Sequence, residues 1–145
     1  MVSKFAERLT ELMDEADLNA LELTTIIGCG NSAINRYRKG ELPSLNTLIR
    51  IADYFQCTTD FLLGLTEEST SQRFLPVPPF SERLPFLLKH FGVSAYRLQK
   101  MTGIGETTMR DWKKNISLPS IDSIIRIAEK LECSVEFVIG RTNWE

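Results

Sequence analysis

The chain has 145 residues, of which 43% are hydrophobic and 25% are charged, and its formal net charge is −2. No run of about 18 uncharged apolar residues is present and the first residues lack the apolar segment of a signal peptide, so we expect a cytoplasmic protein with no membrane partner. An acidic chain also argues against a nucleic-acid ligand unless its cations gather on one face.

A first amphipathic helix is predicted from Ser3 to Ala16, where apolar residues recur at helical spacing between charged ones. A second helix begins at Asn19, and Glu22 follows three residues later, where it can complete a capping box. A third helix is predicted from Asn31 to Lys39, and Gly40 stands at a position that favours a left-handed cap. Glycines 28 and 30 interrupt the helical pattern between the second and third helices, which indicates a helix-turn-helix.

Two further helices complete this segment. Ser44 can cap a fourth helix, whose apolar stripe runs from Leu45 to Phe55. A short fifth helix is predicted from Thr59 to Leu63 and ends at Gly64. A helical segment of this size can bury a compact core, although such small domains are marginal alone.

The same pattern occurs twice. Shifting the chain by 75 residues places 94–115 on 19–40, and one extra residue before Pro119 makes the shift 76 from there. The helices predicted for the second copy are Phe80 to Phe91, Ala95 to Thr102, Glu106 to Lys114, Ile121 to Leu131 and Val135 to Ile139. The repeat therefore predicts an all-α protein with two tandem five-helix domains, residues 1–66 and 80–145.

A linker is predicted between the copies, over residues 67–79. It is polar at first and then rich in proline, which cannot continue a helix and favours extended geometry. Phe74, Leu75 and Val77 are unusually apolar for a linker. They either pack on one of the domains or form a strand that binds a partner.

The cysteines and the histidine offer no pattern for catalysis or metal binding. Cys29, Cys57 and Cys133 lie inside apolar patterns and are expected to be small, reduced core residues rather than a disulfide or a zinc site. His90 has no nearby sequence partner that would make it a ligand or a base. We expect no metal, no cofactor and no enzymatic activity, because a phosphate-binding glycine loop and a nucleophile and base pair are also missing from the pattern.

The order of five helices, with P-S-[LI]-x-x-[LI]-I-R-I-A at the start of the fourth, resembles the lambda-repressor-like (Xre/Cro) helix-turn-helix family. The resemblance covers both copies. It implies that the start of each third helix enters the major groove of DNA and that the second helix crosses the phosphate backbone.

Candidate DNA-binding residues follow from this resemblance. In the first copy, residues 24–40 contain three cations and no acidic residue, although acidic residues crowd the first helix. Asparagine suits adenine, arginine suits guanine and serine adapts to several base edges. The implied base-reading positions hold Asn31, Ser32, Asn35 and Arg36 in the first copy and Glu106, Thr107, Arg110 and Asp111 in the second. The implied phosphate contacts are Arg38, Lys39, Arg97, Lys100, Lys113 and Lys114.

Two features weaken the resemblance as a guide to function. Early in the second helix, where the family commonly has a phosphate-binding glutamine, the first copy has Leu21-Glu22 and the second has Tyr96-Arg97. Glu22 repels phosphate unless the cap occupies it, whereas Arg97 attracts it. Glu106 and Asp111 place carboxylates on the second reading face, where they suit DNA only if they accept from cytosine.

Two classes of function remain open on the sequence. The first is a sequence-specific transcriptional regulator, expected to be a repressor, that binds double-stranded DNA with two unlike half-sites as an intrachain pseudo-dimer. The alternative is a protein-interaction module, such as an antirepressor or an assembly factor. A further homodimer is left open, and Trp144 either covers the fifth helix of the second copy or belongs to a subunit contact.

Overall fold

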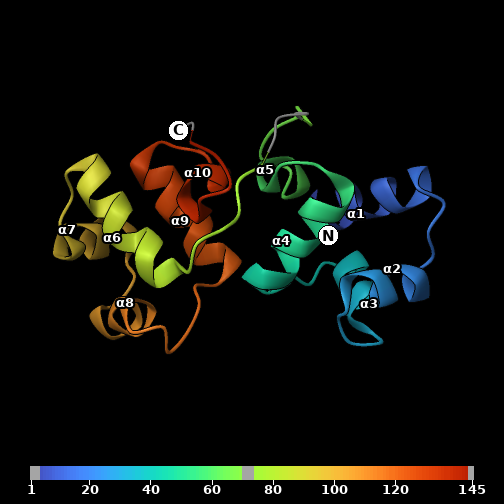
Figure 1. Cartoon of the computed structure of the whole chain (residues 1–145), viewed down its shortest axis with the longest axis horizontal. Coiled ribbons are helices and arrows are strands. Elements are labelled where there is room, and N and C mark those ends of the chain that lie inside the picture. Colours follow the sequence, from blue (N-terminus) through green and yellow to red (C-terminus); the bar gives the residue numbers. More distant parts are fainter. Residues whose placement is uncertain (1–3, 70–73, 144–145) are drawn as a thin grey trace. The chain divides into compact units, whose positions relative to one another are not determined.

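The computed structural model describes residues 4–69 and 74–143 and is all-α over that part of the chain, as predicted. The chain divides into two compact units, Met1–Gln72 and Arg73–Glu145. The first unit contains α1 (Lys4–Glu15), α2 (Ala20–Ile27), α3 (Ala33–Arg38), α4 (Leu45–Phe55) and α5 (Thr59–Leu62). The second contains α6 (Phe80–Phe91), α7 (Ala95–Thr102), α8 (Glu106–Lys113), α9 (Ile121–Leu131) and α10 (Val135–Ile139) (Figure 1).

Side-chain caps set the starts of the second helices. In α2 the predicted capping box is confirmed: the Glu22 N–H donates to Asn19 Oδ1 at 2.8 Å, and the Asn19 N–H donates to Glu22 Oε1 at 3.1 Å. In α7 the Ser94 hydroxyl accepts from the Arg97 N–H at 3.0 Å. Each cap satisfies backbone donors that a helix leaves without intrahelical partners.

The third helix of the first unit starts later than predicted. It begins at Ala33, and the residues before it form a turn in which the Ala33 N–H donates to the Gly30 carbonyl at 3.0 Å. Ser32 has φ −103° and ψ 0° and makes no side-chain cap. The prediction of helix from Asn31 was therefore wrong by two residues. The physical reason is that asparagine and serine favour such turns. In the second unit Gly105 is extended and α8 begins at Glu106, as predicted.

The core of each unit fixes its third helix through an aromatic residue. Tyr37 and Trp112 occupy equivalent positions on α3 and α8, and both are buried. Each meets a phenylalanine of the first helix of its unit edge to face, an arrangement that aromatic pairs favour. The ring centroids are 6.0 Å apart for Phe5 and Tyr37 and 5.6 Å apart for Phe80 and Trp112.

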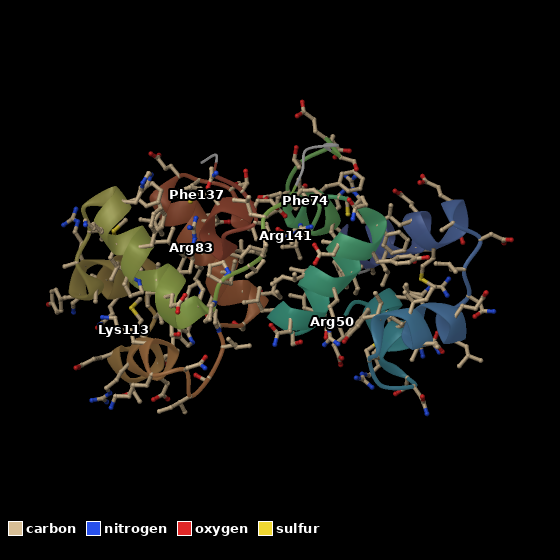
Figure 2. All side chains as sticks on the ribbon, viewed as in Figure 1. Arg50, Phe74, Arg83, Lys113, Phe137 and Arg141 are labelled. Atoms are coloured by element: carbon tan, nitrogen blue, oxygen red, sulfur yellow. The ribbon has the colours of Figure 1, made fainter. Side chains whose placement is uncertain are left out.

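An arginine of the first helix also covers a phenylalanine of the fifth in both units. The guanidinium carbon of Arg8 lies 4.0 Å from the centre of the Phe61 ring. Arg83 lies 4.8 Å from the centre of the Phe137 ring, and Figure 2 shows these two side chains together. Arg83 Nε also donates to the Phe137 carbonyl at 3.1 Å. Burial lowers the pKa of the Arg83 guanidinium.

Residues 74–79, the later part of the predicted linker, pack on the second unit. Arg141, whose side chain is fully buried, lies with its guanidinium carbon 4.0 Å from the centre of the Phe74 ring (Figure 2). Its carbonyl accepts from the Leu75 N–H at 2.8 Å. Its Nη1 donates to Glu136 Oε1 at 2.6 Å, so a buried ion pair lies directly beneath the segment. Of the two interpretations of Phe74 and Leu75, packing on a domain is the one observed.

A close backbone approach holds the same segment near the end of α10. A Cβ added at Gly140 would lie 2.8 Å from Cδ of Pro78, and the φ of Gly140 is +93°. Glycine meets both demands because it has no side chain and tolerates positive φ. Trp144 lies outside the described residues, and none of the described helices is long and apolar enough to cross a membrane.

Candidate nucleic-acid interface

The third helix of each unit is anchored on one side and open to solvent on the other. Ile34 and Tyr37 of α3, and Met109 and Trp112 of α8, are buried. All thirteen residues predicted from the sequence as DNA contacts are exposed, namely Asn31, Ser32, Asn35, Arg36, Arg38, Lys39, Arg97, Lys100, Glu106, Thr107, Arg110, Lys113 and Lys114. Lys113 is labelled on α8 in Figure 2. Each outer face can therefore meet a ligand without any change in the core.

In the first unit, Arg36 is held by two neighbours. Its Nε donates to Glu41 Oε2 at 2.9 Å, and its Nη1 donates to the Ser32 hydroxyl at 2.8 Å. The hydrogen bond and charge of Glu41 raise the pKa of the guanidinium. These contacts occupy Nε and one Nη1 proton and hold the guanidinium on the outer face, where the remaining Nη1 and Nη2 donors can pair with two acceptors on a guanine edge.

The end of α3 explains how Glu41 reaches Arg36. The Glu41 N–H donates to the Arg36 carbonyl and the Gly40 N–H to the Tyr37 carbonyl, both at 3.1 Å. Gly40 has φ +114°, so the chain reverses here in a Schellman-type cap. The cap brings a carboxylate back beside a side chain five positions earlier.

The second unit has the same cap but a different outer face. Asn115 takes the positive φ of 58°, and the position of Glu41 holds Ile116, which is 67% exposed. Arg110, one position before the equivalent of Arg36, donates from Nη2 to the Thr107 hydroxyl at 3.4 Å. Asp111 stands at the position of Arg36 and is half-buried. The carboxylate that steers an arginine in one unit therefore has no counterpart in the other.

The second helices also differ at their amino ends. Glu22 is engaged in the capping box of α2, so its carboxylate is turned to the backbone. The equivalent position in α7 holds Arg97, whose side chain is exposed. Lys100, one turn further along α7, lies with Nζ 5.2 Å from the centre of the Tyr96 ring. Only the second unit thus offers cations from its second helix.

The cysteines and the histidine have structural neighbours rather than a shared site. Cys57 is buried, whereas Cys29 and Cys133 are half-buried. His90 stacks on Phe86, with ring centroids 5.6 Å apart and an angle of 18° between the planes. Within the described residues, no group of three or more histidine, cysteine, aspartate or glutamate side chains could hold a metal ion.

The family model of the Cro/C1-type helix-turn-helix DNA-binding domain matches the chain twice, over residues 8–68 and 83–139. The chain belongs to the Cro/C1-type helix-turn-helix family. No curated protein and no solved structure matches it. Each match spans the five helices of one unit or nearly so, which agrees with the resemblance noted from the sequence. A DNA-binding regulator domain is thus present in two copies.

Sequence reasoning missed three residues that contact the candidate interface of this Cro/C1-type protein. Glu41 was passed over because it lies beyond the third helix and is acidic. Arg50 and Arg126 contact the turn between the second and third helices from the fourth helix of each unit. The same exposed residue, arginine, stands at this position of the fourth helix in both copies. This repetition beside the apolar stripe is a signal that could have found them.

Proposed function

We propose that the chain is a sequence-specific transcriptional regulator, acting as a repressor, that reads double-stranded DNA with both helix-turn-helix units. The observation that carries the proposal is the geometry of the third helices. A buried aromatic residue fixes each one, and its outer face presents exposed polar and charged side chains. A rigid helix with exposed hydrogen-bonding groups at its amino end is what base readout in the major groove requires.

The two units divide the contacts differently. In the first, Asn31, Ser32, Asn35 and Arg36 face bases, and Arg38 and Lys39 face phosphates at the end of the helix. In the second, Glu106, Thr107 and Arg110 face bases, and Arg97, Lys100, Lys113 and Lys114 face phosphates. The exposure of every one of these side chains and the oriented guanidinium of Arg36 support the assignment.

The chain works as a pseudo-dimer in this proposal. A helix-turn-helix dimer addresses half-sites one helical turn apart, about 34 Å, and here the second unit is covalently linked. Linking raises the effective concentration of the second unit, so two weak footprints give one useful affinity. Because the units differ at every base-facing position, the preferred site has two unlike halves.

Selection from a random pool of DNA duplexes tests this function. The expected result is one enriched site with two unlike halves, whose affinity for the chain falls steeply as salt rises. A folded variant with alanine at Asn31, Asn35 and Arg36 should lose the preference in one half only. Equal binding by this variant and the unchanged chain would remove the first unit from the interface.

A second candidate is a protein-interaction module, and exposed apolar residues favour it. Leu21 on α2 and Tyr96 on α7 occupy equivalent positions and are 70% and 66% exposed. Residues 1–72 also carry eleven acidic residues against six basic ones. This net negative charge repels DNA before any contact forms and so lowers the rate of association. If this function is the correct one, the chain should show little affinity for random duplex DNA at any salt concentration.

A further inference from the structure

An arginine of the fourth helix ties down the end of the second helix in each unit. Arg50 of α4 donates from Nη1 to the Ile27 carbonyl at 3.2 Å (Figure 2 labels Arg50). Arg126 of α9 donates from Nη1 to the Thr102 carbonyl at 3.1 Å. The two arginines are equivalent under the 76-residue shift, and the two carbonyls belong to the last residues of α2 and α7. The same contact is therefore present in both copies.

The chemistry of a helix end accounts for the contact. The last carbonyls of a helix lack intrahelical donors, and the negative end of the helix dipole favours a cation there. A guanidinium supplies both the charge and the donor. In the first unit the same guanidinium nitrogen would lie 3.8 Å from a Cβ placed on Gly28, so it sits directly against the turn.

We propose that Arg50 and Arg126 are positioning residues for DNA recognition. The fourth helix belongs to the core of each unit, since Leu48, Ile51 and their equivalents are fully buried. The arginine links this fixed helix to the residue at which the chain turns into the third helix. It thereby sets the angle at which α3 or α8 presents its outer face. The inference rests on the proposed function and adds two residues that face neither bases nor phosphates.

The second unit has an additional lock on its turn. The buried Thr102 hydroxyl donates to the Leu98 carbonyl at 2.7 Å and accepts from the Ile104 N–H at 3.3 Å. The first unit has Ile27 at the position of Thr102 and the half-buried Cys29 at that of Ile104. Its turn therefore depends more on the arginine. Loss of Arg50 should harm recognition more than loss of Arg126.

The test uses the full chain and three variants, Arg50→Ala, Arg50→Lys and Arg126→Ala. Affinity is measured for the selected duplex and for a scrambled duplex over a salt series. Arg50→Ala should lower the ratio of the two affinities on the order of tenfold, as for loss of a charge-assisted hydrogen bond, without changing the salt slope. Arg50→Lys should recover part of the ratio, because an ammonium can still donate to the carbonyl. Arg126→Ala should have the smaller effect.

Two controls separate positioning from other roles. Lys130→Ala removes a cation from α9, one turn beyond Arg126, and should leave the ratio unchanged. Amide hydrogen exchange at residues 28–30 should speed up in Arg50→Ala, which reports a loosened turn without reference to DNA. If the alanine variant does not fold, the affinity ratio and the exchange at residues 28–30 are measured in Arg50→Lys, and the same outcomes decide.

Several results would overturn the inference. An equal loss on both duplexes with a flatter salt slope would make Arg50 a phosphate contact. A lower melting temperature with an unchanged affinity ratio would make it a stabilising residue only. No change in either ratio or exchange would remove the contact from recognition. By contrast, an unchanged chain that shows no salt-dependent DNA binding would overturn the proposed function itself, before any variant is compared.

Discussion

In the first unit a glutamate from the loop after α3 holds the candidate base-reading arginine, whereas in the second unit an exposed isoleucine takes that place. The second unit in turn has a threonine lock in its turn and a buried arginine under the segment that precedes α6. The contacts that place the third helix are nearly the same in both. Duplication thus kept the scaffold and left the outer face and the edges free to diverge, as fold and function commonly separate.

Cutting the chain between the two units should have the largest effect on DNA affinity. Cleavage between Ser71 and Gln72, at an inserted protease site, leaves Phe74 attached to the second unit. Each half should then bind the selected duplex about 10²- to 10⁴-fold more weakly than the intact chain, because effective concentration is lost. Gel-shift titration of the chain before and after cleavage measures this. A half that matches the intact chain in affinity and site length would end the pseudo-dimer proposal.

Replacing the buried Arg141 should lower the stability of the second unit and leave that of the first unchanged. Arg141→Met leaves the Glu136 carboxylate in a buried site without its ion-pair partner, so the second unit should lose about 3–5 kcal/mol of unfolding free energy. The equivalent position in the first unit is Leu65, which is 49% exposed, and Leu65→Met should cost almost nothing. Chemical denaturation of the full chain should show the second unit unfolding earlier. The double variant Arg141→Met, Glu136→Gln should recover part of the loss.

A smaller effect is expected from the arginines of the third helices. Arg36→Ala should weaken binding to the selected duplex roughly tenfold and relax the preference at one base position. Glu41→Gln should have an intermediate effect, because the neutral amide still accepts a hydrogen bond but supplies no charge. Arg110→Ala should relax a position in the other half-site. Competition with duplexes mutated one pair at a time measures these preferences. An even loss over all duplexes would reassign Arg36 to phosphate.

The smallest effect concerns the caps of the second helices. Asn19→Ala should cost the first unit about 1 kcal/mol of stability, as should Ser94→Ala in the second. Glu22→Ala should cost less, since it removes only the reciprocal half of the box. It also removes a carboxylate from the helix that crosses the DNA backbone in the proposed complex, so affinity should not fall. Thermal unfolding and gel-shift titration together check both effects. A drop in affinity for the folded Glu22→Ala variant would contradict the view that the cap occupies this carboxylate.

Most of the fold could be predicted because its signals are local. The Asn19 and Glu22 capping box, the apolar stripes and the glycine turn each depend on residues a few positions apart. The start of α3 was missed because Asn31 and Ser32 are compatible with a helix start and with a turn, and the structure has a turn in which the Ala33 N–H donates to the Gly30 carbonyl. The positions of the candidate contacts came from the family resemblance, and the structure shows all of them exposed.

The parts that could not be predicted depend on contacts distant in sequence. Arg50 and the Ile27 carbonyl are 23 positions apart, and Arg126 and Thr102 are 24 apart. Arg141 meets Phe74 through the packing of a whole unit, which no local pattern encodes. The Glu41 contact depends on the chain reversal at Gly40, and an acidic residue in that loop carries no signal of its own.

The two ends of the connecting segment are each held by an arginine, and this bears on operator architecture. Arg8 donates to the Thr66 carbonyl at 3.3 Å and to Glu67 at 2.9 Å, while Arg141 holds Phe74. Six residues, 68–73, lie between these points, and even fully extended they bridge at most about 25 Å. In the proposed pseudo-dimer such a short tether limits the distance between the two half-sites. Inserting half a helical turn of DNA between the half-sites would therefore strain the tether. The Glu67 carboxylate is 87% exposed, and exposed ion pairs are weak. Under such strain the Arg8–Glu67 contact at the first unit would break before the Arg141–Phe74 contact at the second.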